Sequence, residues 1–313
     1  MRIILIGQAP FGARTLEALL DAGEEVVAVY TPLEKPGAKP DPLKEAAREK
    51  AIKNIQPKTF KDEQVLGEFA GFRPDLVVLA FVTNIVPQRY FSVAKNGAVC
   101  YHPSILPRHR GASAINWALI MGDKRTGLTI FWPDEGIDTG PILLQKEVDI
   151  GADDTAGSLY FNRLFPMGVE AIVESVKLIE GGKAPRIAQD DSKATYEPRC
   201  DDRVADLDWE RTGQQIHDLI RGCDPQPGAY ADFHGEMVRF YGAGFVPGKI
   251  GGDIDAAPGM VTGLDLKGLR IAVAGGELLV TKVRTESAGK LDATAWAVAA
   301  NVKPGDRFRK FSK

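Results

Sequence analysis

The sequence predicts a two-domain α/β protein in which a mainly parallel sheet is followed by a smaller domain of short strands. Three observations support this fold class. The chain has 313 residues, more than one hydrophobic core usually serves. Its first half alternates apolar strands with amphipathic helices, and its last third consists of short strands separated by glycines. Its composition, 44% hydrophobic and 26% charged, is that of an ordinary globular protein.

The strands of the first half are predicted from short apolar runs that end at glycine, proline or polar residues. They are Arg2–Ile6, Glu25–Tyr30, Asp75–Phe81, Gly97–His102, Thr126–Trp132 and Ile142–Ile150. The run Asp75–Phe81 is apolar on both faces, which is typical of a central strand in a parallel sheet covered on both sides. The order of these runs therefore favours a sheet built from βαβ units.

The helices of the first half are predicted from apolar residues that recur at three- and four-residue spacing. They are Pro10–Ala22, Pro42–Lys50, Lys61–Phe72, Ala112–Met121 and Thr155–Glu180. Two of them have recognisable starts. Asp41 precedes a proline, as an N-cap precedes the first helical position. Thr59 has the spacing of a capping box before the third helix.

The composition changes after residue 182. Residues 183–204 are polar and contain two prolines, so we expect a linker that lies over the surface. One more helix is expected at Trp209–Arg221. The strands expected after it are Ala229–Phe233, Met237–Tyr241, Gly259–Thr262, Gly268–Ala274 and Glu277–Arg284. These bounds predict domains at 1–182 and 205–313 joined by the 183–204 linker, with the second domain a small β-barrel or sandwich.

Composition and charge exclude several classes of protein. The longest apolar run, Leu76–Val82, is about a third of what a membrane-spanning helix needs, so no membrane partner is expected. The run Ile3–Ile6 is too short for a signal-peptide core. Three cysteines far apart in the sequence, without CxxC spacing, fit a reduced, cytoplasmic setting. Residues 201–313 carry 15 basic and 16 acidic side chains, which argues against a non-specific nucleic-acid binder.

The turn Gly7–Gly12 joins a strand to a helix, as a dinucleotide-binding turn does. Two of its residues do not fit that role. Ala9 replaces the glycine that lets a pyrophosphate approach the backbone, and Pro10 removes one N–H donor. No acidic residue closes the second strand. We therefore expect a structural turn and no nicotinamide cofactor.

The segment Cys100–Gly111 is the first candidate for a reactive site. Cys100 and His102 point to the same face of a strand because side chains alternate with a period of two. His102 ends that strand, since Pro103 cannot continue the ladder. Ligands bind at this end of parallel strands, and a histidine there is suited to proton transfer. A buried core histidine with its nitrogens hydrogen-bonded is the alternative interpretation.

The segment Asp134–Gly140 is the second candidate, because it places three acidic residues within five positions between two strands. Asp and Gly together are also typical of a solvated turn. No metal is expected, since the spacing lacks the calcium-loop pattern and no second His or Cys lies nearby in the sequence.

Taken together, these two segments resemble the signature of the formyl-transfer enzymes that use 10-formyltetrahydrofolate. The matching positions are His102, Ser104, Pro107, Gly111, Asp138, Thr139 and Gly140. Among these enzymes the whole chain is most similar to the hydrolase domain of 10-formyltetrahydrofolate dehydrogenase, and it also resembles methionyl-tRNA formyltransferase. The resemblance implies a Rossmann-like catalytic domain followed by a small, OB-like β-barrel domain.

The resemblance also implies roles for individual residues. His102 and Asp138 would be the catalytic pair. Asn84, Ile85 and Val86 would form the folate-contacting segment, helped by Leu79, Phe81 and Asp138; for Leu79 and Phe81 taken singly, plain strand core is the alternative. The formyl donor would be 10-formyltetrahydrofolate, with no metal and no nicotinamide.

Cys100 departs from the pattern of the transferases, which carry asparagine two residues before the catalytic histidine. The asparagine amide can donate to a developing oxyanion, whereas a thiol is a weak donor. The hydrolase domain lacks this asparagine as well. Cys100 therefore favours water over an amine as the formyl acceptor, while a small buried core residue explains a strand cysteine equally well.

We therefore expect an enzyme that deformylates 10-formyltetrahydrofolate to tetrahydrofolate and releases formate. Transfer to methionyl-tRNA, a small amine or a sugar is the alternative, and a non-catalytic folate-binding module is the alternative of another class. The module would be expected to have lost His102 or Asp138. No carrier or aldehyde dehydrogenase segment follows residue 313, so the full dehydrogenase reaction is not expected.

The charge of the chain argues against transfer RNA as a partner. The segment Pro32–Pro40 after the second strand is short and carries two lysines and one glutamate, whereas the tRNA enzymes have a long basic loop there. A local basic patch is the counter-argument, formed by Lys303, Arg307, Arg309, Lys310 and Lys313. The sequence does not determine the oligomeric state.

Overall fold

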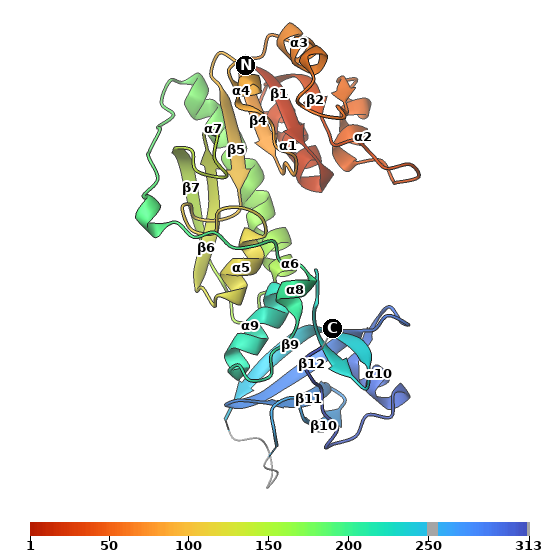
Figure 1. Ribbon diagram of the computed structural model, residues 1–313. Coiled ribbons are helices and arrows are strands. Elements are labelled where there is room, and N and C mark those ends of the chain that lie inside the picture. Colours follow the sequence, from red (N-terminus) through yellow and green to blue (C-terminus); the bar gives the residue numbers. More distant parts are fainter. Residues whose placement is uncertain (249–255, 312–313) are drawn as a thin grey trace. The chain divides into compact units, whose positions relative to one another are not determined.

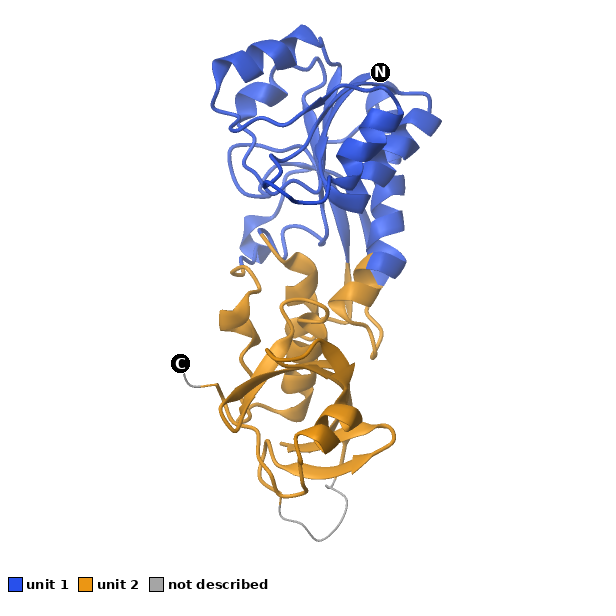
Figure 2. Cartoon of the chain, turned by 90° about the vertical axis from the view of Figure 1, so that its right-hand side faces the viewer, with its two compact units in different colours: residues 1–111, 127–148, 161–196 blue, residues 112–126, 149–160, 197–313 orange. Residues whose placement is uncertain are grey.

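The computed structural model describes residues 1–248 and 256–311, which form two compact units (Figure 2). Unit 1 consists of residues 1–111, 127–148 and 161–196. Unit 2 consists of residues 112–126, 149–160 and 197–313. Lys313, one of the basic residues named above, lies outside the described residues.

Unit 1 is built on a seven-stranded sheet with the order β3-β2-β1-β4-β5-β6-β7 (Figure 1). The strands are β1 Arg2–Gly7, β2 Glu25–Tyr30, β3 Asn54–Ile55, β4 Leu76–Ala80, β5 Ala98–His102, β6 Arg125–Phe131 and β7 Ile142–Asp149. β1 to β5 pair in parallel, and β6 runs antiparallel to β5. This confirms the predicted mainly parallel, Rossmann-like sheet; β3, which has only two residues, was not predicted.

Helices cover both faces of this sheet. They are α1 Ala9–Asp21, α2 Pro42–Glu49, α3 Glu63–Gly71, α4 Gln88–Phe91 and α7 Phe165–Glu180. Ile3 and Leu5 of β1 pack with α1, α2 and α7, whereas Ile4 and Ile6 pack with α3 and α4. Because side chains alternate along a strand, two apolar cores require strands that are apolar on both faces, as the sequence shows.

Two helix predictions in this part of the chain differ from the structure. The third helix begins at Glu63 because Asp62, not Thr59, is its N-cap and accepts from the backbone N–H of Gln64 at 2.9 Å. The helix expected over 155–180 has three parts, α6 Ala156–Leu159, a π-helical turn Tyr160–Leu164, and α7. The interruption lies just before Pro166, which has no backbone N–H to continue the ladder.

The first part of the predicted linker pairs with a strand of unit 1. Ile187 exchanges two backbone hydrogen bonds with Ile142 of β7, at 2.8 and 2.9 Å. A short 3-10 helix follows at Asp191–Lys193, and α8 covers Asp202–Ala205. Residues 187–196, which we call the strap, belong to unit 1. Their role depends on pairing with residues far away in the sequence, and composition alone does not reveal that.

Unit 2 contains a separate antiparallel sheet with the order β10-β11-β12-β9-β8, to which β13 adds beside β12. Its strands are β8 Ala229–Phe233, β9 Glu236–Pro247, β10 Val261–Asp265, β11 Gly268–Val273, β12 Gly276–Arg284 and β13 Lys290–Asp292. Its other helices are α5 Ala114–Ile120, α9 Gly213–Gly222 and α10 Ala293–Ala299. β13 and α10 were not predicted.

Two details of unit 2 were not predicted from the sequence. The helix expected from Trp209 begins at Gly213, because Thr212 and Gln215 form a reciprocal capping box, and Trp209 lies in the apolar core instead. Cys200 and Cys223, although far apart in the sequence, are free thiols whose sulfur atoms lie 3.7 Å from each other. Sequence separation alone did not indicate this pairing.

Within residues 1–248 and 256–311, no helix is both long enough and apolar enough to cross a membrane.

Candidate functional site

His102 ends β5, at the edge of the sheet where open α/β folds bind ligands. Val99 and Tyr101 pack into the core under α1 and α7, so Cys100 and His102 point to the opposite face. His102 pairs in register with Thr129 of β6 and is only 6% exposed. The local strand pattern therefore fixes the position of the imidazole.

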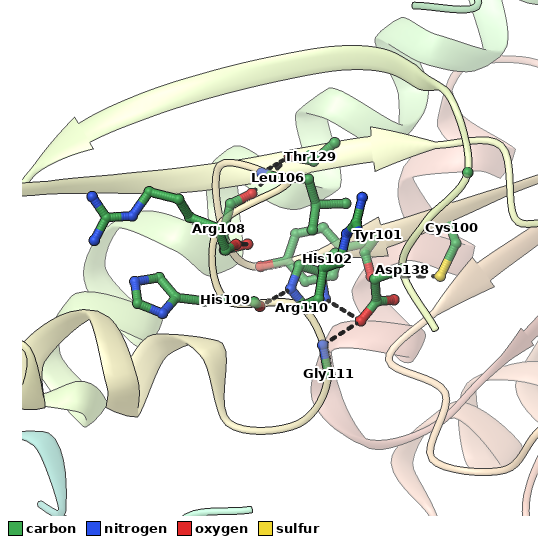
Figure 3. Close-up of polar contacts among 12 residues, drawn as sticks. Cys100, Tyr101, His102, Leu106, Arg108, His109, Arg110, Gly111, Thr129 and Asp138 are labelled. Carbon is green, nitrogen blue, oxygen red and sulfur yellow. Dashed lines mark hydrogen bonds and ion pairs between the residues drawn. The ribbon is translucent and has the colours of Figure 1, made fainter. Parts of the chain in front are cut away.

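The two ring nitrogens of His102 have different neighbours (Figure 3). Nε2 lies 2.8 Å from the carbonyl oxygen of His109. Because a carbonyl oxygen only accepts, Nε2 carries the proton in this hydrogen bond. Nδ1 lies 3.4 Å from Oδ2 of Asp138. In the neutral ring, the nitrogen that can take up a proton is thus the one that faces the carboxylate.

Asp138 is held in place from its backbone and from its side chain. Its φ angle of 56° lies in the left-handed region, which is uncommon for residues other than glycine. Its Oδ2 accepts a hydrogen bond from the backbone N–H of Gly111 at 2.7 Å. Figure 3 shows the carboxylate between His102 and Gly111. The structure thus brings together the two residues that the resemblance identified as a pair.

The rest of the acidic segment shapes the loop that carries Asp138. The hydroxyl of Thr139 and the backbone N–H of Gly136 both donate to Oδ1 of Asp134. A Cβ at Gly140 would lie 1.8 Å from the carbonyl oxygen of Trp132, so only glycine fits there. Asp134, Thr139 and Gly140 therefore have structural roles in this loop.

The motif residues after His102 fold the loop that presents the His109 carbonyl. The hydroxyl of Ser104 donates to the carbonyl oxygen of Arg108 at 2.6 Å. Thr129 Oγ1 donates to the carbonyl oxygen of Ser104 and accepts from the backbone N–H of Leu106. The amide of Gln145 donates to the carbonyl oxygen of Leu106. Sequence reasoning missed the role of Thr129, for which the only signal was a polar residue in an apolar strand.

Cys100 is partly buried beside the pair, and its thiol donates weakly to the carbonyl oxygen of Tyr101 over 3.7 Å. Burial, together with the negative charge of Asp138, raises the pKa of the Cys100 thiol. The thiol therefore stays protonated at neutral pH, and a protonated thiol is a poor nucleophile. This favours a non-covalent role for Cys100.

The predicted folate-contacting residues divide into two groups. Leu79 and Val86 are buried and belong to the core beneath α3 and α4. Phe81 and Ile85 are 45% and 87% exposed, and Asn84 is exposed as well. Phe81 and Asn84 also line a hollow at the carboxyl ends of β1, β2 and β4. Strand core therefore explains Leu79 but not Phe81.

The turn after β1 is occupied by the protein's own carboxylate. Both side-chain oxygens of Asp41 accept from the backbone N–H of Ala9, at 2.8 and 3.1 Å, at the start of α1. Gly7 is required for packing, since a Cβ there would lie 2.3 Å from the carbonyl oxygen of Ala80. A helix start that already faces a carboxylate is poorly suited to a pyrophosphate.

Metal ligands do not gather in the part of the chain that the structure describes: it contains no group of three or more His, Cys, Asp or Glu residues placed to hold an ion.

Comparison with known proteins gives two domain matches and several long relatives. Residues 1–176 match the formyl transferase family, and residues 201–301 match the formyl transferase C-terminal domain. The chain is 43% identical over 275 residues to the mitochondrial 10-formyltetrahydrofolate dehydrogenase of Mus musculus, which covers 84% of this chain and 30% of that protein. It is 33% identical over 315 residues to the methionyl-tRNA formyltransferase of Geotalea uraniireducens (strain Rf4), which covers 99% of this chain and 98% of that enzyme.

The similarity to solved structures concerns the fold alone. HypX from Aquifex aeolicus in complex with tetrahydrofolic acid superposes with a TM-score of 0.69 at 19% identity, covering 100% of this chain and 51% of that one. The chain spans only 27–36% of the length of the 10-formyltetrahydrofolate dehydrogenases that it matches.

Proposed function

Because this chain belongs to the formyl transferase family, whose enzymes use 10-formyltetrahydrofolate, we propose that it removes the formyl group from that donor with His102 and Asp138 as the catalytic pair. The products with water as acceptor are tetrahydrofolate and formate. The observation that carries this proposal is the 3.4 Å approach of His102 Nδ1 to Asp138 Oδ2 at the carboxyl end of β5.

The reaction requires one proton to leave the attacking water and one proton to reach the departing N10 nitrogen. The attacking water must lose a proton as it adds to the formyl carbon, and the N10 nitrogen needs one to leave. In this proposal His102 Nδ1 takes up the proton, because Nε2 already directs its own proton at the His109 carbonyl. Asp138 stabilises the resulting imidazolium, and the Gly111 N–H keeps its carboxylate in position.

Water is supported as the acceptor by the residue beside the pair. By the resemblance described above, Cys100 would occupy the position where the amine-formylating enzymes carry asparagine. Removing one oxyanion donor typically costs about 2.7–4 kcal/mol of transition-state stabilisation. The raised pKa of its thiol keeps Cys100 neutral, and a neutral thiol is only a weak donor to an oxyanion. This combination favours a slower enzyme that uses water over one built for fast transfer to an amine.

Methionyl-tRNA formylation is the second candidate, and one observation favours it: the chain matches almost the whole length of the Geotalea uraniireducens methionyl-tRNA formyltransferase. The charge of residues 201–313, 15 basic against 16 acidic side chains, argues against it, because phosphate contacts dominate affinity for nucleic acid.

We keep the division into a catalytic domain at 1–182 and a second domain at 205–313 as part of the proposal. The extents of the two domain matches, 1–176 and 201–301, support it. That the antiparallel sheet of unit 2 closes into an OB-like barrel, and that the protein works in the cytoplasm, are likewise proposals.

The test is incubation of the protein with 10-formyltetrahydrofolate alone, with assays for formate and tetrahydrofolate. The reaction is then repeated with charged initiator tRNA and with a small amine. Formate release that these acceptors do not accelerate is the expected result. Turnover only in the presence of tRNA would establish the second candidate, and no turnover under any condition would leave a non-catalytic folate-binding module.

A further inference from the structure

The strap, residues 187–196, lies between the two domain matches and contacts both loops of the catalytic pair. The matches end at residue 176 and resume at residue 201. Within the strap, Gln189 bonds to the loop that carries Asp138, and Thr195 bonds to the loop that carries His109. A segment that sequence composition marks as a linker thus joins the two loops that must be held together.

The side chain of Gln189 binds backbone carbonyls of the loop that carries Asp138. Its Nε2 donates to the carbonyl oxygen of Asp138 at 2.9 Å and to the carbonyl oxygen of Gly140 at 2.7 Å. Trp132 packs closely against the same loop, since a Cβ at Gly140 would lie 1.8 Å from the Trp132 carbonyl oxygen. The uncommon left-handed backbone at Asp138 needs such surrounding contacts to persist.

Arg110 orients the amide of Gln189. Its guanidinium is buried, 3% exposed, and donates from Nε and Nη2 to Gln189 Oε1 at 3.1 and 2.8 Å. Because a guanidinium only donates and the two carbonyls only accept, the amide of Gln189 has one possible orientation here. Arg110 also donates to the hydroxyl of Tyr196 at 2.7 Å and to Asp191 Oδ1 at 2.6 Å.

The same strap fixes the loop that binds His102. Thr195 Oγ1 accepts from the backbone N–H of His109 at 2.8 Å, and the Thr195 carbonyl accepts from the backbone N–H of Arg110 at 3.0 Å. His109 supplies the carbonyl that binds His102 Nε2. The residue after Arg110 is Gly111, whose N–H binds the Asp138 carboxylate. The strap, the loop with His109 and the loop with Asp138 are therefore all connected to one another by hydrogen bonds.

We propose that Gln189, aligned by Arg110, is a positioning residue that holds the Asp138 carboxylate against the His102 imidazole. The proposal rests on the proposed function for its kinetic consequence but not for its geometry. Gln189 acts only through the backbone of Asp138 and Gly140, so the effect of changing it is expected on the chemical step and not on binding of the folate.

The variant Gln189→Glu separates positioning from simple fold support. A carboxylate still accepts from the Arg110 guanidinium, so the buried cation keeps its partner. It cannot donate to the carbonyls of Asp138 and Gly140, and it repels them. We expect kcat to fall on the order of 10- to 100-fold with KM nearly unchanged. Gln189→Met, which has a similar size and no charge, provides a second variant if Gln189→Glu does not fold.

Asp191→Asn is the matched control. Asp191 contacts the same guanidinium as Gln189, but its side chain is 81% exposed, and its carboxylate bonds to Arg110 where Gln189 bonds to the Asp138 loop. The amide oxygen of asparagine can still accept the hydrogen bond from the buried Arg110 guanidinium, so this variant should keep kcat within about twofold. Equal losses in Gln189→Glu and Asp191→Asn would show that Arg110 needs its partners for the fold alone, and would overturn the proposal.

A spectroscopic readout makes the test independent of the reaction. The ring ¹⁵N resonances of His102 at fixed pH, assigned with His102→Ala, should move in Gln189→Glu towards those of Asp138→Asn and stay unchanged in Asp191→Asn. Wild-type resonances and wild-type kcat in Gln189→Glu would refute the positioning role. Moved resonances in a protein that never releases formate would uphold the positioning role and reject the proposed function.

Discussion

Two segments of unit 1 follow neighbouring parallel strands at the same edge of the sheet and differ in almost every physical property. From the last residue of β5 onward, His102, Ser104, His109 and Arg110 are at most 6% exposed and are bound by hydrogen bonds. After β4, Phe81 and Ile85 are 45% and 87% exposed. The residues at the end of β5 are buried and hydrogen-bonded, whereas those after β4 expose apolar side chains to solvent.

The difference indicates that the segment after β5 serves proton transfer and the segment after β4 serves ligand binding. Groups that move protons must be held within a few tenths of an ångström, and buried hydrogen-bonded networks provide that rigidity. Exposed apolar side chains gain free energy when a ligand covers them, about 25 cal/mol per Å². Substitutions after β5 are therefore expected to change kcat, and substitutions after β4 to change KM.

The largest effect is expected from the pair itself. His102→Ala and Asp138→Asn should each abolish turnover, lowering kcat by about 10³-fold or more, because the proton shuttle or its partner is lost. The fold should persist, since the amide oxygen introduced by Asp138→Asn can still accept from the Gly111 N–H. Stopped assays of formate and thermal melts check both points. Near-normal rates in either variant would contradict the assigned roles.

The next effect concerns the acceptor. Cys100→Asn should raise the rate of transfer to an amine relative to hydrolysis, by up to about 100-fold, because an amide replaces a weak thiol donor beside the developing oxyanion. The ratio of formylated amine to formate, measured with one donor concentration, reports the change. Cys100→Ala serves as the control, since it removes the thiol without adding a donor. An unchanged ratio in Cys100→Asn would count against tuning towards water.

The segment after β4 should respond in the opposite way. Ile85→Ala is expected to raise KM for 10-formyltetrahydrofolate by roughly 10- to 60-fold and leave kcat within twofold, because it removes three carbons that each contribute up to about 0.8 kcal/mol when a ligand buries them. Steady-state kinetics separates the two constants. Leu266, fully exposed in unit 2, provides the control, and Leu266→Ala should change neither constant. A fall in kcat for Ile85→Ala would contradict the proposal that the segment after β4 affects only KM.

The contrast between these segments also marks what the sequence could and could not predict. The strands and the placement of His102 at the end of β5 followed from local apolar patterns, because those patterns depend on neighbouring residues. The pairing of His102 with Asp138 was predicted only from the family resemblance. Gln189, which bonds to Asp138 from 51 positions away, gave no local signal. Long-range hydrogen bonds among polar residues leave no periodic trace in a sequence.

The smallest effect concerns the thiol that borders the pair. Burial and then the charge of Asp138 raise the pKa of Cys100 above the ordinary value of 9.0. The folded state thus holds this proton more tightly than the unfolded chain, and its stability should decrease as the pH rises above about 9.

Alkylation by iodoacetamide, followed by peptide mass spectrometry, measures the thiolate directly. Cys100 should react more slowly than free cysteine at pH 8, because so little of it is ionised. Asp138→Asn should accelerate the reaction only a few-fold, since it removes the second cause of the raised pKa and leaves burial, the first, in place. Rapid alkylation at pH 7 in the wild type would instead show an ionised thiol beside His102, and would reopen a covalent role for Cys100.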